Sequence, residues 1–501
     1  MWWADPITYA CIAAYGLAVW WPTRALPYYW DSATFVVDAA RQLLATGFHP
    51  FIATHSDFAH PPLLVALVAL SWKVFGESRE VAHALMLPAL PAAMIATYRL
   101  GSRTGDRSVG AAAAFLFGGV AVVLAEVGQV YMDLPIAAVL AWGLLAWMSD
   151  RPCRAAVLFT AAALMKIPAP LTVPGALMLV VAATPGRRRD AGAYLALAVP
   201  FAVDALWLAY HAAVTGWFVW RPGRRVPAPH GLLDRLEALR SVVAWLLLGQ
   251  WRWALLAAAV LAFLWKRVRR PGLLTQRLWP LPWACPWPPA SQAGQEFRAP
   301  ARARGASPWG CEALLAPIVA GVALFASVGE FGLRYGIYLL PPYLVLCLVQ
   351  VRSALGRSGG ALLGLAAGAL FAGFATTWHP RAERTASYVF RPDENLAYQD
   401  MIAIGRRSAR WLETKHADDE IYGAGPEAYE LSEPWQGYVT RPLGFARCID
   451  FERHPGARQL VLIHAYHPQQ PLCRRIIEAT GAEALVRFEA NGKWVEVWQV
   501  P

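Results

Sequence analysis

Long apolar runs recur from the start of the chain to about residue 376, and short polar loops separate them. A helix needs about 18 to 20 apolar residues to cross the hydrocarbon core of a bilayer. The pattern therefore predicts a polytopic α-helical membrane protein with about eleven spans. The boundaries of each span are predicted to a precision of several residues. The predicted spans are Ile7–Trp21, Val81–Leu100, Val109–Val127, Leu134–Met148, Ala155–Leu164, Leu171–Ala183, Ala191–Tyr210, Val242–Trp265, Leu314–Val328, Tyr335–Val349 and Gly359–Thr376.

Two segments interrupt this pattern within the predicted membrane domain, which covers residues 1–377. The first is a long loop over 23–80, with an amphipathic stretch Asp31–Leu44 and an apolar run Pro61–Phe75. That run is short for a tilted span, so we expect it to lie in the membrane interface. The second, over 266–310, is rich in Pro, Trp, Arg and Ala without periodicity, which predicts a linker.

The tail over 378–501 regains a soluble composition, and its length suffices for a core of its own. An Asn491-Gly492 pair between two alternating runs predicts a closing hairpin. We expect a small α/β domain with strands at Glu420–Gly423, Gln459–Ile463, Ala484–Phe488 and Lys493–Val500 and a helix at Cys473–Thr480. Of the seven cysteines only Cys448 and Cys473 fall in this tail, and an oxidising compartment permits a disulfide between them.

Basic residues predict the orientation, because short cytoplasmic loops carry an excess of Arg and Lys. The first span gives a weaker, opposite indication, since Asp5 precedes it and Arg24 follows it. Five later loops outweigh it and place the N-terminus and the 266–310 linker in the cytoplasm and the tail outside. These loops carry Arg99, Arg103 and Arg107; Arg151 and Arg154; Arg187, Arg188 and Arg189; Lys266, Arg267, Arg269 and Arg270; and Arg352 and Arg357.

Composition agrees with this picture. Of 501 residues, 57% are hydrophobic and 16% are charged, whereas soluble proteins average roughly 45–50% and about 25%. This excludes a single soluble domain and global disorder. The formal net charge of +11 comes mostly from Arg spread over the loops, which predicts contact with a membrane surface and no nucleic-acid partner.

Polar residues accumulate at the predicted external ends of the spans. Polar side chains at a membrane cost free energy unless they are paired or face water. These residues are therefore functional candidates. Five motifs follow in one order: Tyr29-Trp30-Asp31; His60-Pro61-Pro62; Met132-Asp133-Leu134-Pro135; Leu164-Met165-Lys166-Ile167-Pro168; and Arg334-Tyr335 before Leu339-Leu340-Pro341-Pro342.

This arrangement, over about Thr8 to Val351, resembles the polyprenyl-phosphate-dependent members of the glycosyltransferase C superfamily. The specific likeness is to the bacterial, glycosyltransferase family 39-like group of protein O-mannosyltransferases and the lipid A aminoarabinose transferase. Members usually carry an acidic pair where Asp31 is followed by Ser32, and many lipid A-directed relatives carry Lys where His60 stands. The acceptor therefore stays open.

The resemblance implies transfer of a sugar, with inversion, from a polyprenyl-phosphate donor to a lipid, glycan or protein at the external face of a bacterial inner membrane. Such a transfer needs a base for the acceptor and cations for the phosphate. We expect Asp31 to be the base with Asp133 beside it. Lys166, Arg334, Arg224 and Arg225 are the expected phosphate contacts, and His60, Asp57 and Tyr335 the expected substrate-loop residues.

Each assignment has a structural alternative. Asp31 and Asp133 can cap helices, Lys166 can snorkel to the interface, and Arg334 can pair with Glu330. Arg224 and Arg225 can bind headgroups without catalysis. A divalent cation stays open as a cofactor, because His55, Asp57 and His60 offer donor atoms at a spacing that matches no closed metal site.

Two other classes of protein have to be weighed against a glycosyltransferase. A transporter or lipid-linked-sugar flippase should show internal repeats and charges near mid-span. We find no convincing repeat, and the polar candidates lie at span ends. A receptor or scaffold that works through the tail leaves the motifs of the first half unexplained.

Overall fold

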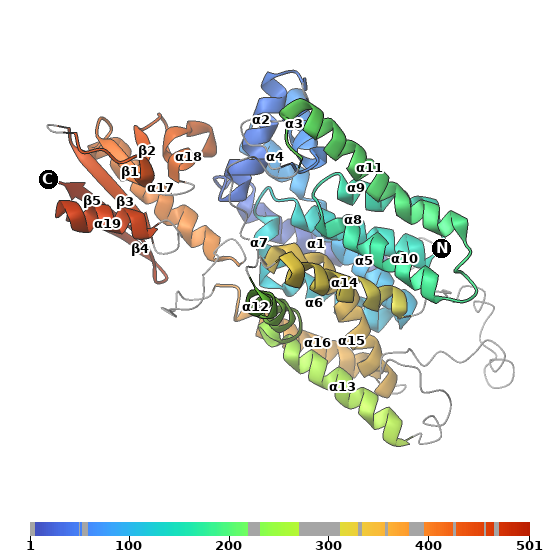
Figure 1. Ribbon diagram of the computed structural model, residues 1–501. Helices are drawn as coiled ribbons and strands as arrows, with labels where there is room; N and C mark the ends of the chain where they lie inside the picture. Colours follow the sequence, from blue (N-terminus) through green and yellow to red (C-terminus); the bar gives the residue numbers. More distant parts are fainter. Residues whose placement is uncertain are drawn as a thin grey trace.

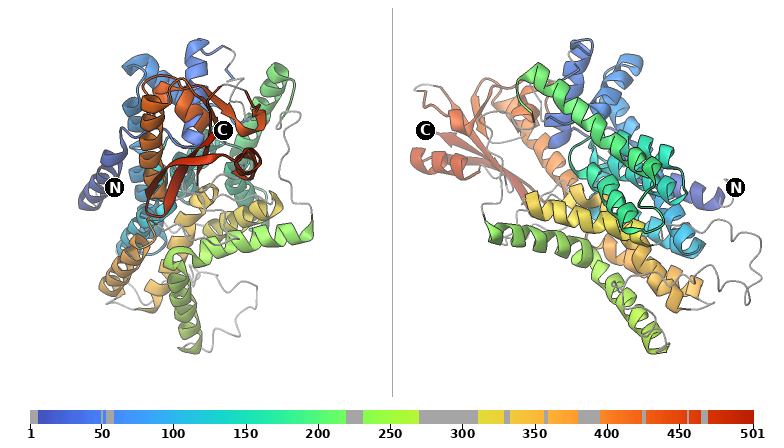
Figure 2. Two further views of the ribbon diagram at one scale, coloured as in Figure 1. Left: turned by 90° about the vertical axis from the view of Figure 1, so that its left-hand side faces the viewer. Right: turned by 45° about the vertical axis from the view of Figure 1, so that its right-hand side comes forward.

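The computed structural model describes residues 6–49, 51–52, 59–218, 231–269, 311–328, 333–355, 359–379, 395–423, 427–454, 457–464 and 470–501. Figure 1 shows a large bundle of helices and, beside it, a smaller part built on a sheet. The N-terminus lies at the end of the bundle that faces away from the sheet, in Figure 1 and in the right-hand view of Figure 2.

The bundle is built from apolar helices that pack in neighbouring pairs. The most extensively packed pairs are α5 with α6, α8 with α9, α5 with α8, α9 with α11, α10 with α14, and α13 with α15. The helices are α1 (Pro6–Trp20), α2 (Asp38–Ala45), α3 (Leu63–Phe75), α4 (Arg79–Met86), α5 (Ala89–Thr104), α6 (Arg107–Gly119), α7 (Ala121–Val127), α8 (Asp133–Met148), α9 (Pro152–Ala163), α10 (Thr172–Ala183), α11 (Ala191–Thr215), α12 (Leu232–Val243), α13 (Arg252–Arg269), α14 (Glu312–Val328), α15 (Leu340–Ala354) and α16 (Gly359–Ala375).

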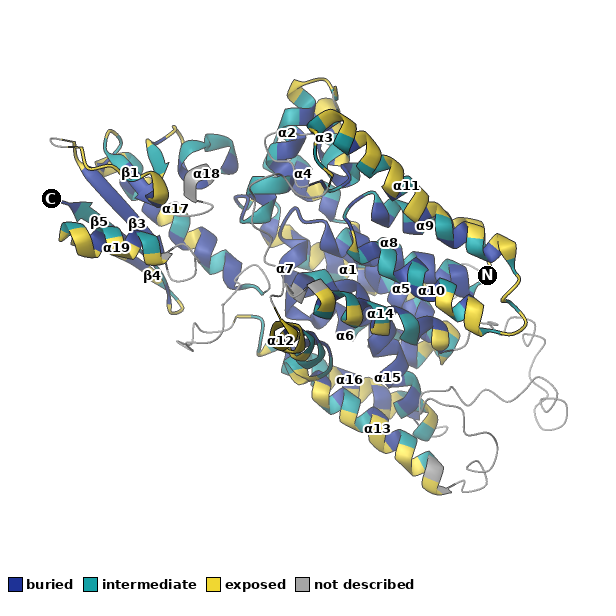
Figure 3. Ribbon diagram, in the orientation of Figure 1, coloured by how far each residue is buried: buried dark blue, intermediate teal, exposed yellow. Residues whose placement is uncertain are grey.

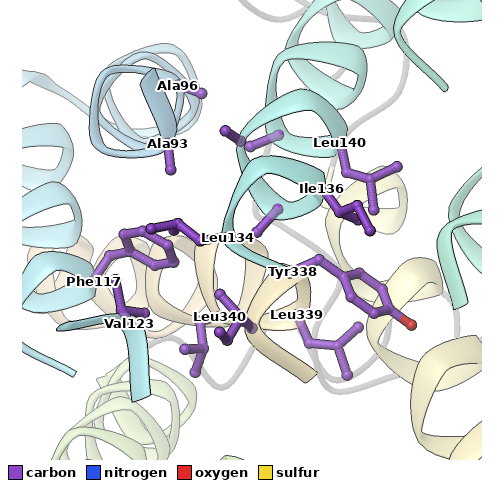
Figure 4. Packing of buried hydrophobic residues seen from close by; sticks show 14 of the residues in the cluster. Ala93, Ala96, Phe117, Val123, Leu134, Ile136, Leu140, Tyr338, Leu339 and Leu340 are labelled. Atoms are coloured by element: carbon purple, nitrogen blue, oxygen red, sulfur yellow. The ribbon is translucent and has the colours of Figure 1, made fainter. Parts of the chain in front are cut away.

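Small residues let these helices approach closely, as is common in membranes. A Cβ on Gly101 of α5 would lie 2.8 Å from the Cα of Gly110 on α6, so neither position has room for a side chain. Figure 4 shows Ala93 and Ala96 of α5 beside the larger core side chains of α8 and α15, such as Leu134.

The outer face of the bundle is apolar. Yellow, exposed stretches run along α11 and α13 in Figure 3, and the exposed residues there include Leu195, Leu206, Leu261 and Leu264. Apolar patches of this extent on a helix surface mark contact with a membrane or another protein. This surface fits lipid.

Four helical stretches among the described residues are long and apolar enough to cross a membrane: Arg79–Thr104, Ala191–Thr215, Leu232–Lys266 and Arg334–Ala354. The α6–α7 pair makes a fifth if it counts as one bent span, and six shorter apolar helices of 10–17 residues accompany them. The total of about eleven spans stays a prediction.

Three predicted spans differ in form from the expected straight helices. The span predicted at Val81–Leu100 divides into α4 and α5 at Pro88, which cannot donate a backbone hydrogen bond. The one predicted at Val109–Val127 bends by 69° between α6 and α7, directly after Gly118-Gly119. The one predicted at Val242–Trp265 begins earlier, with α12, and is interrupted at Gln250, where φ is 51°.

The tail forms the expected α/β fold around a five-stranded sheet of order β2-β1-β3-β5-β4. The three strands β1, β2 and β3 are parallel, whereas β5 runs antiparallel to β3 and β4. The elements are α17 (Ala397–Lys415), β1 (Glu420–Gly423), α18 (Glu427–Ser432), β2 (Phe445–Arg447), β3 (Gln459–His464), α19 (Gln470–Thr480), β4 (Glu483–Ala490) and β5 (Lys493–Val500).

All four predicted strands and the predicted helix of the tail are present. The β4–β5 turn has positive φ at Asn491 (51°) and Gly492 (75°), as a two-residue hairpin turn of this sequence requires. The long helix α17 and the three-residue strand β2 had not been predicted.

The expected disulfide between Cys448 and Cys473 is present, and the two Cα atoms are 5.4 Å apart. Both cysteines are buried in a small apolar cluster between the sheet and α19. We expect neither thiol to react with an alkylating reagent in the unfolded, unreduced protein, and both to react after reduction. Mass spectrometry of the tail peptides measures this, and alkylation without reductant would contradict the pairing.

The tail packs on the end of the bundle that carries the first loop. The Tyr398 hydroxyl of the tail lies against Gly128 of the bundle, where a Cβ atom on residue 128 would be 1.8 Å from the hydroxyl oxygen. The ring centres of Tyr398 and Tyr29 are 6.3 Å apart. The Tyr28 N–H donates to the Gln436 carbonyl at 3.3 Å. The tail and the loop that bears Asp31 therefore share one side of the bundle.

The orientation of this side stays a prediction, which reporter fusions can test. Because α16 crosses the bundle, reporters fused after Leu355 and after Thr377 should report opposite compartments, cytoplasmic and external respectively. The same compartment for both fusions would remove the proposed topology.

Candidate active site

One pocket at the tail-facing end of the bundle gathers residues from all five sequence motifs. It encloses about 60 Å³ between the lining residues, which is room for only a few water molecules at about 10–15 Å³ each. The lining residues are Asp31, Phe35, Val36, His60, Tyr131, Met132, Asp133, Lys166, Arg334 and Tyr335.

Two acidic and two basic side chains meet in this pocket. Arg334 donates a hydrogen bond to the Asp31 carboxylate. Lys166 Nζ lies 2.6 Å from Asp133 Oδ1, and Arg334 Nε lies 3.8 Å from Asp133 Oδ2. The two positive and two negative charges balance, and each cation already has a carboxylate partner. An anionic ligand would have to compete with these carboxylates for the cations.

This pairing decides several of the structural alternatives. Asp31 stands at the start of a helix, but its side chain makes no capping hydrogen bond. Asp133 is the first residue of α8 and binds Lys166, whose side chain is 13% exposed and does not extend to the interface. Arg334 bonds Asp31, and its predicted alternative partner Glu330 lies outside the described residues, so that alternative stays open.

Aromatic rings form part of the pocket wall and hold the two cations. Lys166 Nζ lies 3.9 Å from the centre of the Tyr335 ring. The Arg334 guanidinium carbon lies 4.7 Å from the ring centre of Tyr131 and 5.3 Å from that of Tyr335. Cation–π contacts of this kind strengthen when water is excluded. Tyr335 thus shapes the charged cluster.

The backbone before Asp31 is strained in a way that directs the side chain. Trp30 has φ 50°, the left-handed region that non-glycine residues rarely adopt. The next residues, Ser32–Val37, form a π-helix, a rare element often found at functional sites. The predicted amphipathic helix is therefore present, but its first turns are wider than α-helical.

Two hydrogen bonds join this loop to the turn before α8. The Ser32 hydroxyl accepts the Val130 N–H at 3.0 Å, and the Tyr131 hydroxyl donates to the Tyr29 carbonyl at 3.1 Å. Both bonds lie in buried surroundings, so they fix the position of Asp31 relative to Asp133.

His60 follows another strained residue, Ala59, with φ 60°. The Leu63 N–H donates to the Leu164 carbonyl at 2.9 Å, which brings the His60 and Lys166 segments together. Burial lowers the pKa of His60 to about 3; Lys166 adds to this effect and Asp133 opposes it. His60 is therefore neutral near pH 7 and adds no positive charge for a phosphate.

Sequence reasoning missed Glu126, a fully buried residue of α7. One carboxylate oxygen accepts the Leu134 N–H at 3.3 Å, and the other meets no hydrogen-bond partner among the described residues. The carboxylate interacts electrostatically with Asp133, Arg334 and Lys166. The sequence feature that could have identified Glu126 is that it is an acidic residue within a predicted span, and such residues are functional candidates.

Some predicted residues cannot be placed. Asp57, Arg224 and Arg225 lie outside the described residues, as does His55. In the part of the chain that is described, no three His, Cys, Asp or Glu side chains are grouped to hold a metal ion. Because His55 and Asp57 are among the candidate donors, a divalent cation as cofactor stays a prediction.

Comparison with known proteins finds the same architecture in two crystal structures. ArnT from Cupriavidus metallidurans in the apo state aligns over 97% of this chain and 97% of its own, with a TM-score of 0.57 and 12% identity. ArnT bound to undecaprenyl phosphate aligns over the same shares, with a TM-score of 0.52 and 13% identity. No protein-family model and no curated protein matches the chain. The chain therefore shares the fold of these two structures, and the expected fold class, a polytopic helical protein with a small α/β tail, is confirmed.

Proposed function

We propose that this protein is a membrane glycosyltransferase that moves a sugar from a polyprenyl-phosphate donor to an acceptor outside a bacterial inner membrane. The observation that carries the proposal is the charged pocket, in which the acids and bases of five separate segments meet at one end of the bundle. The fold supports it, since ArnT has been crystallised with undecaprenyl phosphate. The working domain is 1–377, and 378–501 covers the pocket side.

Arg334 and Lys166 are the phosphate-binding residues of this proposal. The fork of N–H donors on Arg matches phosphate oxygens, and Lys adds a point charge. Arg334 now bonds Asp31, so the donor phosphate has to replace that carboxylate. The narrow pocket supports this, because a sugar phosphate enters only if the paired side chains separate.

Displacement of Asp31 frees the base at the moment the donor is bound. The carboxylate then takes the proton from the acceptor hydroxyl or amine while the acceptor atom bonds to C1 of the sugar. The C1–O bond to phosphate breaks, and the phosphate keeps the electron pair, which Arg334 and Lys166 stabilise. A single displacement inverts the anomeric centre. Asp133 holds Lys166 in place at 2.6 Å.

The test is to incubate the purified protein, in detergent, with polyprenyl-phosphate sugars and measure release of polyprenyl phosphate. We expect release from the wild type and its near-complete loss in Asp31→Asn. Equal release from both proteins would reject the assigned site, and no release from any donor, with folded protein, would reject the function.

A further inference from the structure

A second pocket lies where the first loop meets the tail. It encloses about 260 Å³, slightly below the range of about 300–1,000 Å³ that drug-sized ligands occupy. Its walls come from the α3–α4 connection, the segment before Asp31 and the tail. The lining residues are Tyr28, Trp72, Glu77, Ser78, Arg79, Glu80, Pro434 and Trp435.

Tyr28 is the residue that points to a ligand. Its side chain is 2% exposed, and its hydroxyl meets no hydrogen-bond partner among the described residues. A buried hydroxyl without a partner costs free energy. Four charged groups act on this hydroxyl: Arg79, Glu77 and Glu80, which line the pocket, and Arg41, which binds Glu77.

Aromatic faces and charged groups stand together in this pocket. The indole N–H groups of Trp72 and Trp435 already donate to the Ser78 carbonyl (2.9 Å) and the Glu433 carboxylate (2.8 Å). Trp72 is buried, so the partly buried Trp435 is the indole that can offer ring surface to a ligand. The Tyr28 and Trp435 ring centres are 6.0 Å apart. Aromatic faces attract the weakly positive C–H groups of a ligand.

Two arginines make contacts beside this pocket. Arg41 binds Glu77 at 2.7 Å and stacks 4.5 Å from the centre of the Trp435 ring. The Arg79 guanidinium lies against the backbone of Gly437, where a Cβ would be 1.4 Å from it. Carboxylate and guanidinium groups bind hydroxyls through charge-assisted hydrogen bonds.

A sugar ring combines the two properties that these walls recognise, C–H faces and a rim of hydroxyls. We propose that this pocket binds a saccharide unit of the acceptor. The role as an acceptor site rests on the proposed function, but binding itself can be measured without turnover. Asp31 comes three positions after Tyr28, so their Cα atoms are at most about 11 Å apart. One glycan can therefore reach both pockets.

Saturation-transfer NMR tests this proposal on the full chain in detergent, with methyl glycosides of glucose, galactose, mannose and N-acetylglucosamine as probes. We expect transfer to the ring protons of at least one probe. Tyr28→Phe should weaken its binding about three- to tenfold because one hydrogen bond is lost. Trp435→Ala should weaken it about tenfold because one aromatic contact is lost.

Thermal unfolding of Tyr28→Phe separates binding from packing. Because the hydroxyl has no partner among the described residues, its removal should leave the melting temperature unchanged or raise it. Trp498→Ala is the matched control, since Trp498 is a partly buried tryptophan of the same domain in the β5 strand. It should bind the probe as the wild type does.

The outcomes distinguish this proposal from the proposed function. If the wild type binds a saccharide, both pocket variants lose that binding, and no sugar transfer is detected, the saccharide site is supported and the proposed transferase activity is rejected. Transfer activity without saccharide binding, or with binding unchanged in Tyr28→Phe and Trp435→Ala, would reject the pocket and keep the enzyme. Asp31→Asn should retain probe binding, because Asp31 does not line this pocket.

Discussion

Asp31→Asn should fold, bind the lipid donor and turn over about 10² to 10⁴ times more slowly, the usual contribution of general-base catalysis. The amide has nearly the same shape as the carboxylate but cannot take the proton of the acceptor. In the wild type the phosphate competes with Asp31 for Arg334. The KM for the donor should therefore stay the same or fall in the variant, while kcat drops.

Steady-state kinetics of polyprenyl phosphate release, with donor and acceptor varied separately, measure both constants. Asp38→Asn is a suitable control, because Asp38 begins the next helix and does not line the pocket. Near wild-type kcat in Asp31→Asn would move the base to Asp133. A higher donor KM would contradict the competition between Asp31 and phosphate.

Arg334→Ala should instead weaken use of the donor. Loss of one charged hydrogen bond costs about 1.5–3 kcal/mol, or roughly 12- to 160-fold in kcat/KM for the lipid donor. Arg334→Lys keeps the positive charge but loses the fork of donors, so its defect should be smaller. The effect should appear in donor titrations and leave the apparent KM for the acceptor nearly unchanged.

Arg352→Ala is the control for the general effect of removing an Arg–Asp ion pair outside the pocket. Arg352 binds Asp106 at 2.6 Å through a partly exposed contact and does not line the pocket. It should leave the donor kinetics near those of the wild type. Unchanged donor kinetics in Arg334→Ala would show that the arginine acts only as a structural partner of Asp31.

Glu126 shows what one sequence could not reveal about the site. It stands within an apolar run and has no motif around it, so nothing in its neighbours pointed to the pocket. The 69° bend between α6 and α7 turns it toward the N-terminus of α8, where it accepts the Leu134 N–H. The bend itself depends on packing, which hydrophobic periodicity does not encode.

The sequence by itself determined the membrane class, the α/β tail and the five polar motifs. Each follows from local physics. The membrane class follows from the length of the apolar runs relative to the bilayer thickness, and the tail from alternating strand patterns with an Asn-Gly turn. The polar motifs stand out because polar groups at helix ends in a membrane cost free energy. The Cys448–Cys473 pair was also readable, since the tail holds only these two cysteines.

Only the tertiary structure decided which charges meet. Asp31 and Arg334 are 303 positions apart in the chain, and Lys166 and Asp133 are 33 apart, so no local pattern relates either pair. The partners are selected by helix packing and by hydrogen bonds between loops, such as that from Val130 to Ser32. The same holds for the Tyr28 pocket, because its walls exist only once the tail docks on the first loop.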